Sequence, residues 1–271
     1  MDDRFAETLD ARLRTLLPEQ YRDSGDTVQP VSMRSAALKY DAGGSVAWDQ
    51  IWGSFCDLAM AGGPPHKGTL LEPGEQTAID ADFARYDAVV EEICRGITLV
   101  TGLRAYPAET VGWVAVTCPG DAMAGWLQRA IVMENIAARR RGAILELPAA
   151  PHFRIEKEIK NVVTAVAKTC HYWAGHIPAA QQQAIAELFI AMARESPLIE
   201  PHDHRQSGWR DVPCPDVRSA VRRMRGLVAC NVLSRREGNR LFVPINAATD
   251  PRREVVTRAL AVVDQWASGA K

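Results

Sequence analysis

The sequence lacks any apolar stretch long enough to cross a lipid bilayer. None of its 271 residues belong to an apolar run close to the roughly 20 residues that a membrane-spanning helix needs. The first residues carry acidic side chains at once, without the apolar centre of a signal peptide. These absences predict a soluble, cytoplasmic protein that has no membrane partner.

Cysteine is sparse and its spacing is irregular. A secreted domain held by disulfides is usually smaller and richer in cysteine, and a zinc or redox motif usually contains a CxxC pair. This chain has no CxxC pair. The pattern favours reduced thiols, as in a cytoplasm. The six cysteines are Cys56, Cys94, Cys118, Cys170, Cys214 and Cys230.

A strong basic excess is also missing. The net charge is −1 and aromatic residues make up 7% of the chain, whereas a nucleic-acid-binding domain usually carries many more cations and aromatics for stacking. The charge is uneven: residues 1–111 hold 10 Lys and Arg against 18 Asp and Glu, but residues 112–172 hold 8 against 5 and residues 208–268 hold 11 against 6. This distribution makes nucleic acid an unexpected partner and predicts an anion-binding face or an internal interface on the basic half.

An internal repeat is the clearest feature of the sequence. Residues 112–148 and 208–244 align without a gap at a shift of 96 residues, and 14 of the 37 positions are identical. Unrelated segments of ordinary composition would share about two or three. We interpret this as a tandem duplication. The shared residues include a Gly-Trp pair, a Cys-Pro pair, one Asn and an Arg-Arg-x-Gly sequence, which begin in the first copy at Gly112, Cys118, Asn135 and Arg139.

Each copy predicts the same order of elements. A short strand ends at Cys-Pro, a helix follows because proline suits a first helical turn, two strands flank the Arg-Arg-x-Gly turn, and a longer helix closes the unit. The expected fold class is therefore α/β, of the α+β type, built on a duplicated βαββα unit. The expected regions are an acidic N-terminal α/β region (1–111), the first unit (112–172), a helical linker (173–207) and the second unit (208–268).

The N-terminal region is less regular. Its first residues predict an amphipathic helix, the glycines near position 43 predict a hairpin turn, and residues 80–99 predict a helix. Between them, residues 61–75 are rich in Gly and Pro and predict an irregular loop.

This loop has the composition of an anion-binding loop. Gly63 and Gly68 permit close approach of the backbone, while His66 and Lys67 supply donors and charge. Neither the GxxxxGK[ST] nor the GxGxxG nucleotide-binding pattern is present. We expect the loop to hold a phosphate or carboxylate, and the alternative is a surface crossing in which Lys67 is solvated.

The paired arginines of the two hairpins are further candidates for binding an anionic substrate. Paired guanidinium groups bind carboxylate or phosphate through two parallel hydrogen bonds. The alternative is that they are solvated turn residues. These residues are Arg139, Arg140, Arg235 and Arg236.

Catalytic chemistry is expected from Cys170, His171 and His66. A thiol nucleophile with a histidine base is one option, and the alternative places Cys170 in the core and His171 at a helix C-terminus. Cys118 and Cys214, expected near helix N-termini, could have lowered pKa values and greater reactivity, or could simply cap their helices. The spacing leaves open whether they share a metal.

His202 and His204 lie on the same side of an extended segment, a geometry that metals accept. No third ligand follows from the spacing, so no metal is assigned, and neither is any cofactor.

Two functions are consistent with these features. The first is a cytoplasmic enzyme of small-molecule metabolism that holds an anionic substrate between the two units and the 61–75 loop. The alternative is a non-catalytic accessory or assembly factor that binds a small anion, a metal or a protein. The sequence leaves homo-oligomer formation open.

Overall fold

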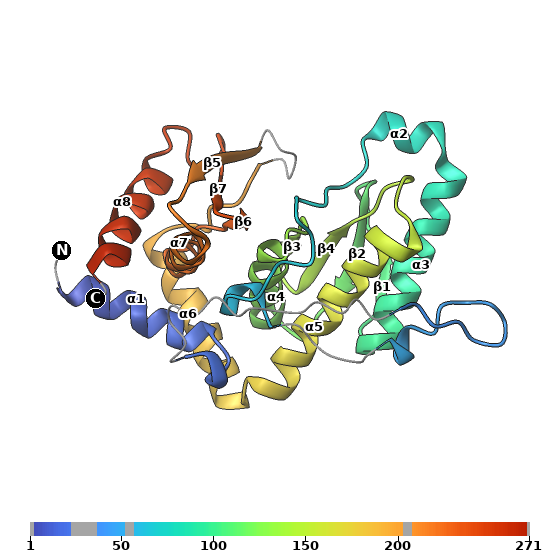
Figure 1. The fold of residues 1–271 in the computed structure, drawn as a ribbon, viewed down its shortest axis with the longest axis horizontal. Helices are drawn as coiled ribbons and strands as arrows, with labels where there is room; N and C mark the ends of the chain where they lie inside the picture. The colour runs from blue at the N-terminus through green and yellow to red at the C-terminus, as the bar shows by residue number, and fades with distance from the viewer. Residues whose placement is uncertain (1–2, 23–36, 52–56, 203–207, 270–271) are drawn as a thin grey trace.

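Two small antiparallel sheets, one toward each end of the long axis, form the framework of the molecule (Figure 1). The computed structural model describes residues 3–22, 37–51, 57–202 and 208–269. Helices pack on both sheets, which confirms the mixed α/β class. No helix in these ranges combines the length and the apolar character needed to cross a membrane.

The first unit forms the larger sheet, in the strand order β1-β2-β4-β3 with every neighbouring pair antiparallel. A π-helical turn (Ile155–Ile159) leads into its last helix. Strand β1 comes from the N-terminal region and pairs with β2, so the sheet has one strand more than the sequence predicted. The elements are β1 (Ala105–Pro107), β2 (Trp113–Thr117), α4 (Asp121–Met133), β3 (Arg139–Arg141), β4 (Ile144–Pro148) and α5 (Lys160–His176).

The second unit has the strand order β5-β7-β6. Its three strands and its first helix begin and end 96 residues after their counterparts in the first unit. The strand register is equivalent too, because Trp113 lies opposite Pro148 and Trp209 lies opposite Pro244. The elements are β5 (Trp209–Pro213), α7 (Val217–Ala229), β6 (Arg235–Glu237), β7 (Arg240–Pro244) and α8 (Glu254–Gly269).

Backbone conformation accounts for two of the identities between the units. Asn135 and Asn231, which follow α4 and α7, have φ angles of 60° and 61°. Gly142 and Gly238, in the hairpin turns, both have φ of 58°. Asparagine and glycine are the residues that tolerate this left-handed conformation best. The same residues recur because both units need the same reversal of chain direction.

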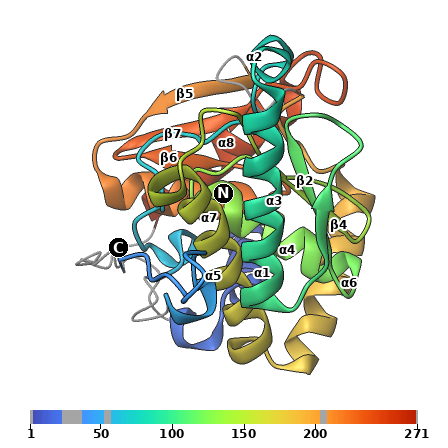
Figure 2. The ribbon, with the colours of Figure 1, turned by 90° about the vertical axis from the view of Figure 1, so that its right-hand side faces the viewer.

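In the described part of the chain, four α-helices lie outside the two units: α1 (Asp3–Leu16), α2 (Gln76–Ala81), α3 (Phe83–Thr101) and α6 (Ala179–Glu195). Helix α3 lies along α5 (Figure 2). A Cβ atom on Gly96 of α3 would lie 2.8 Å from a methyl group of Val163, so glycine allows this close approach. The N-terminal helix is confirmed; the helix expected over 80–99 is divided between α2 and α3.

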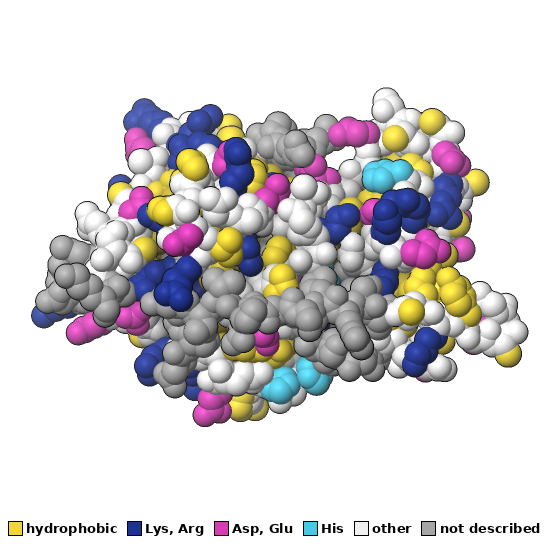
Figure 3. All heavy atoms as spheres, viewed as in Figure 1, with side chains coloured by type: hydrophobic (Ala, Val, Ile, Leu, Met, Phe, Trp, Pro, Cys, Tyr) yellow, Lys and Arg dark blue, Asp and Glu magenta, His cyan; other side chains and the backbone are white. Residues whose placement is uncertain are grey.

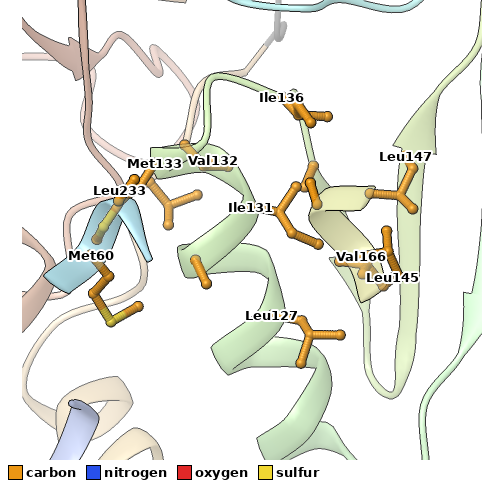
Figure 4. Close-up of a cluster of buried hydrophobic side chains, with 14 of the residues drawn as sticks. Met60, Leu127, Ile131, Val132, Met133, Ile136, Leu145, Leu147, Val166 and Leu233 are labelled. Atoms are coloured by element: carbon orange, nitrogen blue, oxygen red, sulfur yellow. The ribbon is translucent and has the colours of Figure 1, made fainter. Parts of the chain in front are cut away.

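Helix α4 is buried on nearly every side. All its side chains from Met123 to Met133 are buried, because one face packs on the first sheet and on α5 while the other meets the second unit. Figure 4 shows Leu127 and Ile131 toward the β3–β4 hairpin, and Met133 toward Met60 and Leu233. The core is therefore continuous from one unit to the other.

A second internal correspondence precedes the two units. The sequence Leu-x-Glu-Pro occurs at residues 70–73 and again at residues 198–201, a shift of 128 residues. Leu71 forms a parallel bridge with Ile136, and Ile199 forms the equivalent bridge with Val232. The shift is not 96 because α2, α3 and β1 lie between residue 73 and the first unit. The correspondence therefore extends beyond the residues that align at 96.

The glutamates of these segments interact across the molecule. Burial raises the pKa of Glu200, which precedes the second unit, and the charges of Arg140 and Arg139 of the first unit oppose that rise. Burial lowers the pKa of Arg235 of the second unit, and the charge of Glu72, which precedes the first unit, is among those that oppose that fall. The two units are therefore linked reciprocally through charge.

Candidate functional site: a buried charge cluster beside the 61–75 loop

Helix α5 carries a line of polar residues on one face. Lys160, Lys168 and Tyr172 are spaced by eight and four residues, so their side chains lie along one side of the helix. Lysines on a helix are usually exposed to solvent. Lys168 departs from this rule, since it is 2% exposed, and Lys160 is partly buried.

Lys168 forms a buried ion pair with Glu134. Its Nζ lies 2.9 Å from Glu134 Oε1, and both side chains are almost completely excluded from solvent. The same carboxylate accepts hydrogen bonds from the backbone N–H groups of Ala59, at 2.9 Å, and His66, at 3.1 Å. Several donors thus compensate the cost of burying a carboxylate.

The 61–75 loop and the residues just before it are fixed by contacts with both units. Arg225 Nε donates to the Met60 carbonyl at 2.7 Å, and Arg236 Nη2 donates to the Gly63 carbonyl at 3.0 Å. In the first unit, Asn135 Nδ2 donates to the Lys67 carbonyl at 2.9 Å. The loop therefore lies at the junction of the units, and the N–H of His66 is used by a carboxylate of the protein itself.

Gly63 and Gly68, two of the four glycines of the loop, have different surroundings. A Cβ on Gly63 would lie 2.1 Å from the Asp57 carbonyl oxygen, so glycine is required for this close backbone approach. A Cβ on Gly68 would have no atom within 4 Å. Of the two, Gly63 alone is needed for packing.

His66 has the most unusual environment in the cluster. Its Nε2 is shielded from solvent and has no hydrogen-bond partner among the described residues. Burial and the positive charges of Lys168 and Lys160 hold the pKa of His66 well below its usual value. The ring is therefore neutral near pH 7. It retains one ring nitrogen that no protein group uses.

A hydroxyl pair extends the cluster along α5. The Tyr21 hydroxyl bonds to Asp57 Oδ1 and lies 2.8 Å from the Tyr172 hydroxyl. Burial, the Asp57 carboxylate and Tyr172 all raise the pKa of Tyr21 above its usual value. Lys168 Nζ reaches the Asp57 carbonyl at 3.4 Å, which connects this pair to the buried charges.

Lys67 belongs to a separate cavity. Its Nζ lies 3.7 Å from Glu158 Oε1, and Lys67, His152 and Glu158 line a polar cavity of about 460 Å³. His66 is not among its lining residues. His66 and Lys67 therefore face different parts of the molecule although they are adjacent in the loop.

Cys170 and His171 line a third region. They border a largely apolar cavity of about 590 Å³ together with Met123, Trp173 and Pro119. Burial, and more weakly the neighbouring Cys118, raise the pKa of the Cys170 thiol above its usual value. This thiol is therefore protonated at neutral pH. His66 does not line this cavity, so the three residues expected to catalyse are not brought together in it.

The expectation that Cys118 and Cys214 cap helices is wrong. The N-cap residues of α4 and α7 are Gly120 and Asp216, two residues beyond the respective thiols. Burial raises the pKa of Cys118 to about 11 and also raises the pKa of Cys214. The helix N-termini do not produce the expected thiolates.

The four hairpin arginines contact protein groups. Arg139 stacks on Trp113, with its guanidinium carbon 4.2 Å from the ring centre, and pairs with Glu146; Arg235 stacks on Phe242 at 4.0 Å and pairs with Glu237. The buried Nε atom of Arg140 has no hydrogen-bond partner among the described residues. Figure 3 shows Lys and Arg interspersed with Asp and Glu on the face drawn, without a continuous basic stripe.

The His202–His204 pair is only partly described. His204 lies outside the described residues, and the backbone N–H of His202 donates to the Ile245 carbonyl. Within the parts of the chain that the structure describes, no three His, Cys, Asp or Glu side chains are arranged to hold a metal ion.

A match to a known protein would restrict the chemistry of these groups. Comparisons of the chain with models of protein families, with curated proteins and with solved structures find no match in any of the three.

Proposed function

We propose that this chain is a cytoplasmic enzyme of small-molecule metabolism, and that its anionic substrate binds beside His66, between the 61–75 loop and α5. One observation supports this choice of site above the others. His66 Nε2 is buried without a hydrogen-bond partner among the described residues, and two lysines lie close enough to lower the pKa of its ring. A polar atom left unpaired in a protein interior costs free energy, and a catalytic role is one reason for keeping it.

The proposed roles follow from the charges. A neutral imidazole can accept a proton at pH 7, so His66 is the proposed general base. Lys160 and Lys168 supply the positive charge that would hold a carboxylate or phosphate next to it. Glu134 holds both the Lys168 ammonium group and the His66 backbone in position.

We further propose that the two units arose by tandem duplication. The equal element bounds at a shift of 96 residues and the two equivalent parallel bridges support this origin. Position 134 has Cys230 as its counterpart, and position 168 has Asp264. The buried ion pair of the proposed site therefore occurs in the first unit and not in the second, while the second unit fixes the loop of His66 through Arg225 and Arg236.

A thermal-shift screen of phosphorylated and carboxylated metabolites tests the proposal. A true ligand at 100 times its Kd stabilises the protein by about 2.7 kcal/mol. We expect His66→Gln and Lys160→Gln each to weaken this response by roughly ten-fold or more in affinity, because both lose a polar contact to the ligand.

Lys67→Ala is the matched control within the same loop. If the response persists in His66→Gln but disappears in Lys67→Ala, the anion binds in the cavity of Lys67 and Glu158, and the His66 cluster is structural. If no metabolite stabilises the wild-type protein, the enzyme proposal fails and the accessory-factor alternative gains support.

A further inference from the structure

The last turns of α5 bring two imidazole rings together at the protein surface. His171 Nε2 and His176 Nε2 are 3.2 Å apart, and the ring centres are 5.0 Å apart at an interplanar angle of 66°. Residues five positions apart do not share a face of a regular helix, so this approach needs a local reason. A Cβ built on Gly175 would lie 3.9 Å from His171 Cε1. That distance is an ordinary van der Waals contact, so the His171 ring lies over Gly175 as it approaches His176.

We propose that His171 and His176 together bind a divalent ion of a late first-row transition metal, such as Cu²⁺, Ni²⁺ or Zn²⁺. Metal–imidazole bonds are about 2.0–2.1 Å long, so two nitrogens on one ion are about 2.9 Å apart at a right angle and about 3.3 Å apart at the tetrahedral angle. The observed separation of 3.2 Å lies within that interval. An ion therefore fits between the two Nε2 atoms with little side-chain movement.

A neutral imidazole is the form that ligates metals. Burial and the neighbouring His176 lower the pKa of His171. Histidine side chains reach the surface at the lower margin of the face drawn in Figure 3, near the C-terminal end of α5, so an ion can enter from solvent. Imidazole ligands suit Zn²⁺, Cu²⁺ and Ni²⁺, whereas Mg²⁺ prefers oxygen ligands.

Two protein ligands leave open coordination positions, which water or another ligand would fill. His171 also lines the apolar cavity of about 590 Å³ described above. The cavity lining includes no Asp, Glu, Lys or Arg. The metal site uses none of His66, Lys160 and Lys168, although the ring of Tyr172, whose hydroxyl extends the His66 cluster, has its centre 5.1 Å from that of the His176 ring. Either proposal can fail without the other.

Calorimetric titration of untagged protein with CuCl₂, NiCl₂, ZnCl₂ and MgCl₂ tests the site. The wild type should bind one Cu²⁺ more tightly than Ni²⁺, as the general affinity order of these ions requires, and should not bind Mg²⁺. His171→Ala and His176→Ala should each weaken Ni²⁺ binding by about ten-fold or more, equivalent to about 1.4 kcal/mol. His152→Ala removes another exposed histidine and should leave the affinity unchanged.

Cu²⁺ electron paramagnetic resonance gives a second readout. The wild-type spectrum should show coupling to two imidazole nitrogens, and each single variant should show coupling to one. The proposal is overturned if Ni²⁺ produces no binding heat up to on the order of 1 mM. It is equally overturned if both single variants bind as tightly as the wild type, because the two rings then form only a hydrogen-bonded pair.

Discussion

The first and second units have equivalent elements but different interiors. At two equivalent positions the first unit buries the Glu134–Lys168 ion pair, whereas the second has a partly buried Cys230 and an exposed Asp264 that pairs with Arg223. The first unit is also covered by more of the chain than the second. Strand β1 and helix α3 cover the first unit, while β5 pairs only with β7 among the described strands. Where two units share a framework, the groups present in only one identify where specialised chemistry can reside.

Loss of Lys168 tests that difference most strongly. Lys168→Met should lower the free energy of unfolding by about 3–5 kcal/mol, because it leaves the Glu134 carboxylate buried without its cation. At the equivalent position, Asp264→Ala should cost no more than about 1 kcal/mol, since it removes a solvent-exposed pair. Urea unfolding of both variants measures the comparison.

The double variant Glu134→Gln/Lys168→Met serves as the control. It should recover much of the lost stability, because it removes both buried charges. Equal losses in Lys168→Met and Asp264→Ala would show that the buried pair does not distinguish the units.

Replacing the equivalent residues Asn135 and Asn231 tests a feature that the two units share. Asn231 Oδ1 accepts a hydrogen bond from Arg129 at 2.7 Å, and Asn135 Nδ2 donates to the Arg236 carbonyl at 2.7 Å, so each connects its unit to the other. Asn135→Ala and Asn231→Ala should each cost about 2–3 kcal/mol, from lost hydrogen bonds and a strained positive φ.

Replacement by glycine separates these contributions to the unfolding free energy, since Asn135→Gly and Asn231→Gly keep the backbone relaxed. If replacing only one of the two asparagines lowered the unfolding free energy, the two would not play equivalent roles in connecting the units.

The pH dependence of stability concerns His66, which precedes the first unit and lies near Lys168 of its helix α5. The folded protein holds the pKa of His66 below its usual value, so below about pH 6.5 the unfolded chain binds a proton that the folded chain does not. The unfolding free energy should therefore fall with decreasing pH by up to about 1.4 kcal/mol per pH unit, until the folded pKa is reached.

His66→Gln should remove this contribution, which urea unfolding at successive pH values measures. His152 is exposed, so the variant His152→Gln should retain the same pH dependence as the wild type. If the unfolding free energy of His66→Gln depended on pH as it does in the wild type, the His66 imidazole would not be held neutral by burial.

The smallest expected effect concerns the equivalent thiols Cys118 and Cys214. Because burial raises the pKa of Cys118 to about 11, only about one thiol in a thousand or fewer is ionised at pH 7.5. Both cysteines should react slowly with iodoacetamide in the folded protein and quickly after unfolding in urea. Cys214 should be the faster, since the positive charge of Arg223 opposes the effect of burial on its pKa.

Mass-spectrometric peptide mapping over time gives the two rates. Rapid labelling of Cys118 in the folded state would show that its thiol is accessible as a thiolate.

Local sequence signals predicted the framework well. Gly142, Gly238 and the two asparagines require special backbone angles, and Trp113 and Trp209 begin equivalent strands, so these positions show the repeat directly. The Leu-x-Glu-Pro correspondence was missed because α2, α3 and β1 change its spacing. A search allowing one insertion would find it in the sequence alone.

The candidate site was less predictable. The loop residue His66 was identified as a candidate, but its relation to Lys168 depends on how α5 packs against residues 57–67, which no local pattern encodes. Lys168 resembles a solvated helix residue in sequence, because lysine is usually exposed, and its burial follows only from the packing of α5. Cys118 follows a strand and precedes a proline, as a capping residue would, yet α4 begins two residues further along the chain.

The position of α1 has a consequence for synthesis of the chain. Trp266 Nε1 donates to Asp10 Oδ1 at 3.0 Å across a sequence separation of 256 residues, and Arg12 donates to the Ala229 carbonyl at 3.2 Å. At about 5–20 residues per second, a ribosome needs tens of seconds to produce these partners. During that time the apolar side chains Leu9 and Leu13 of the first helix lack part of their final packing. Helix α1 is thus among the last elements to complete its packing, although it precedes every other described helix in the sequence.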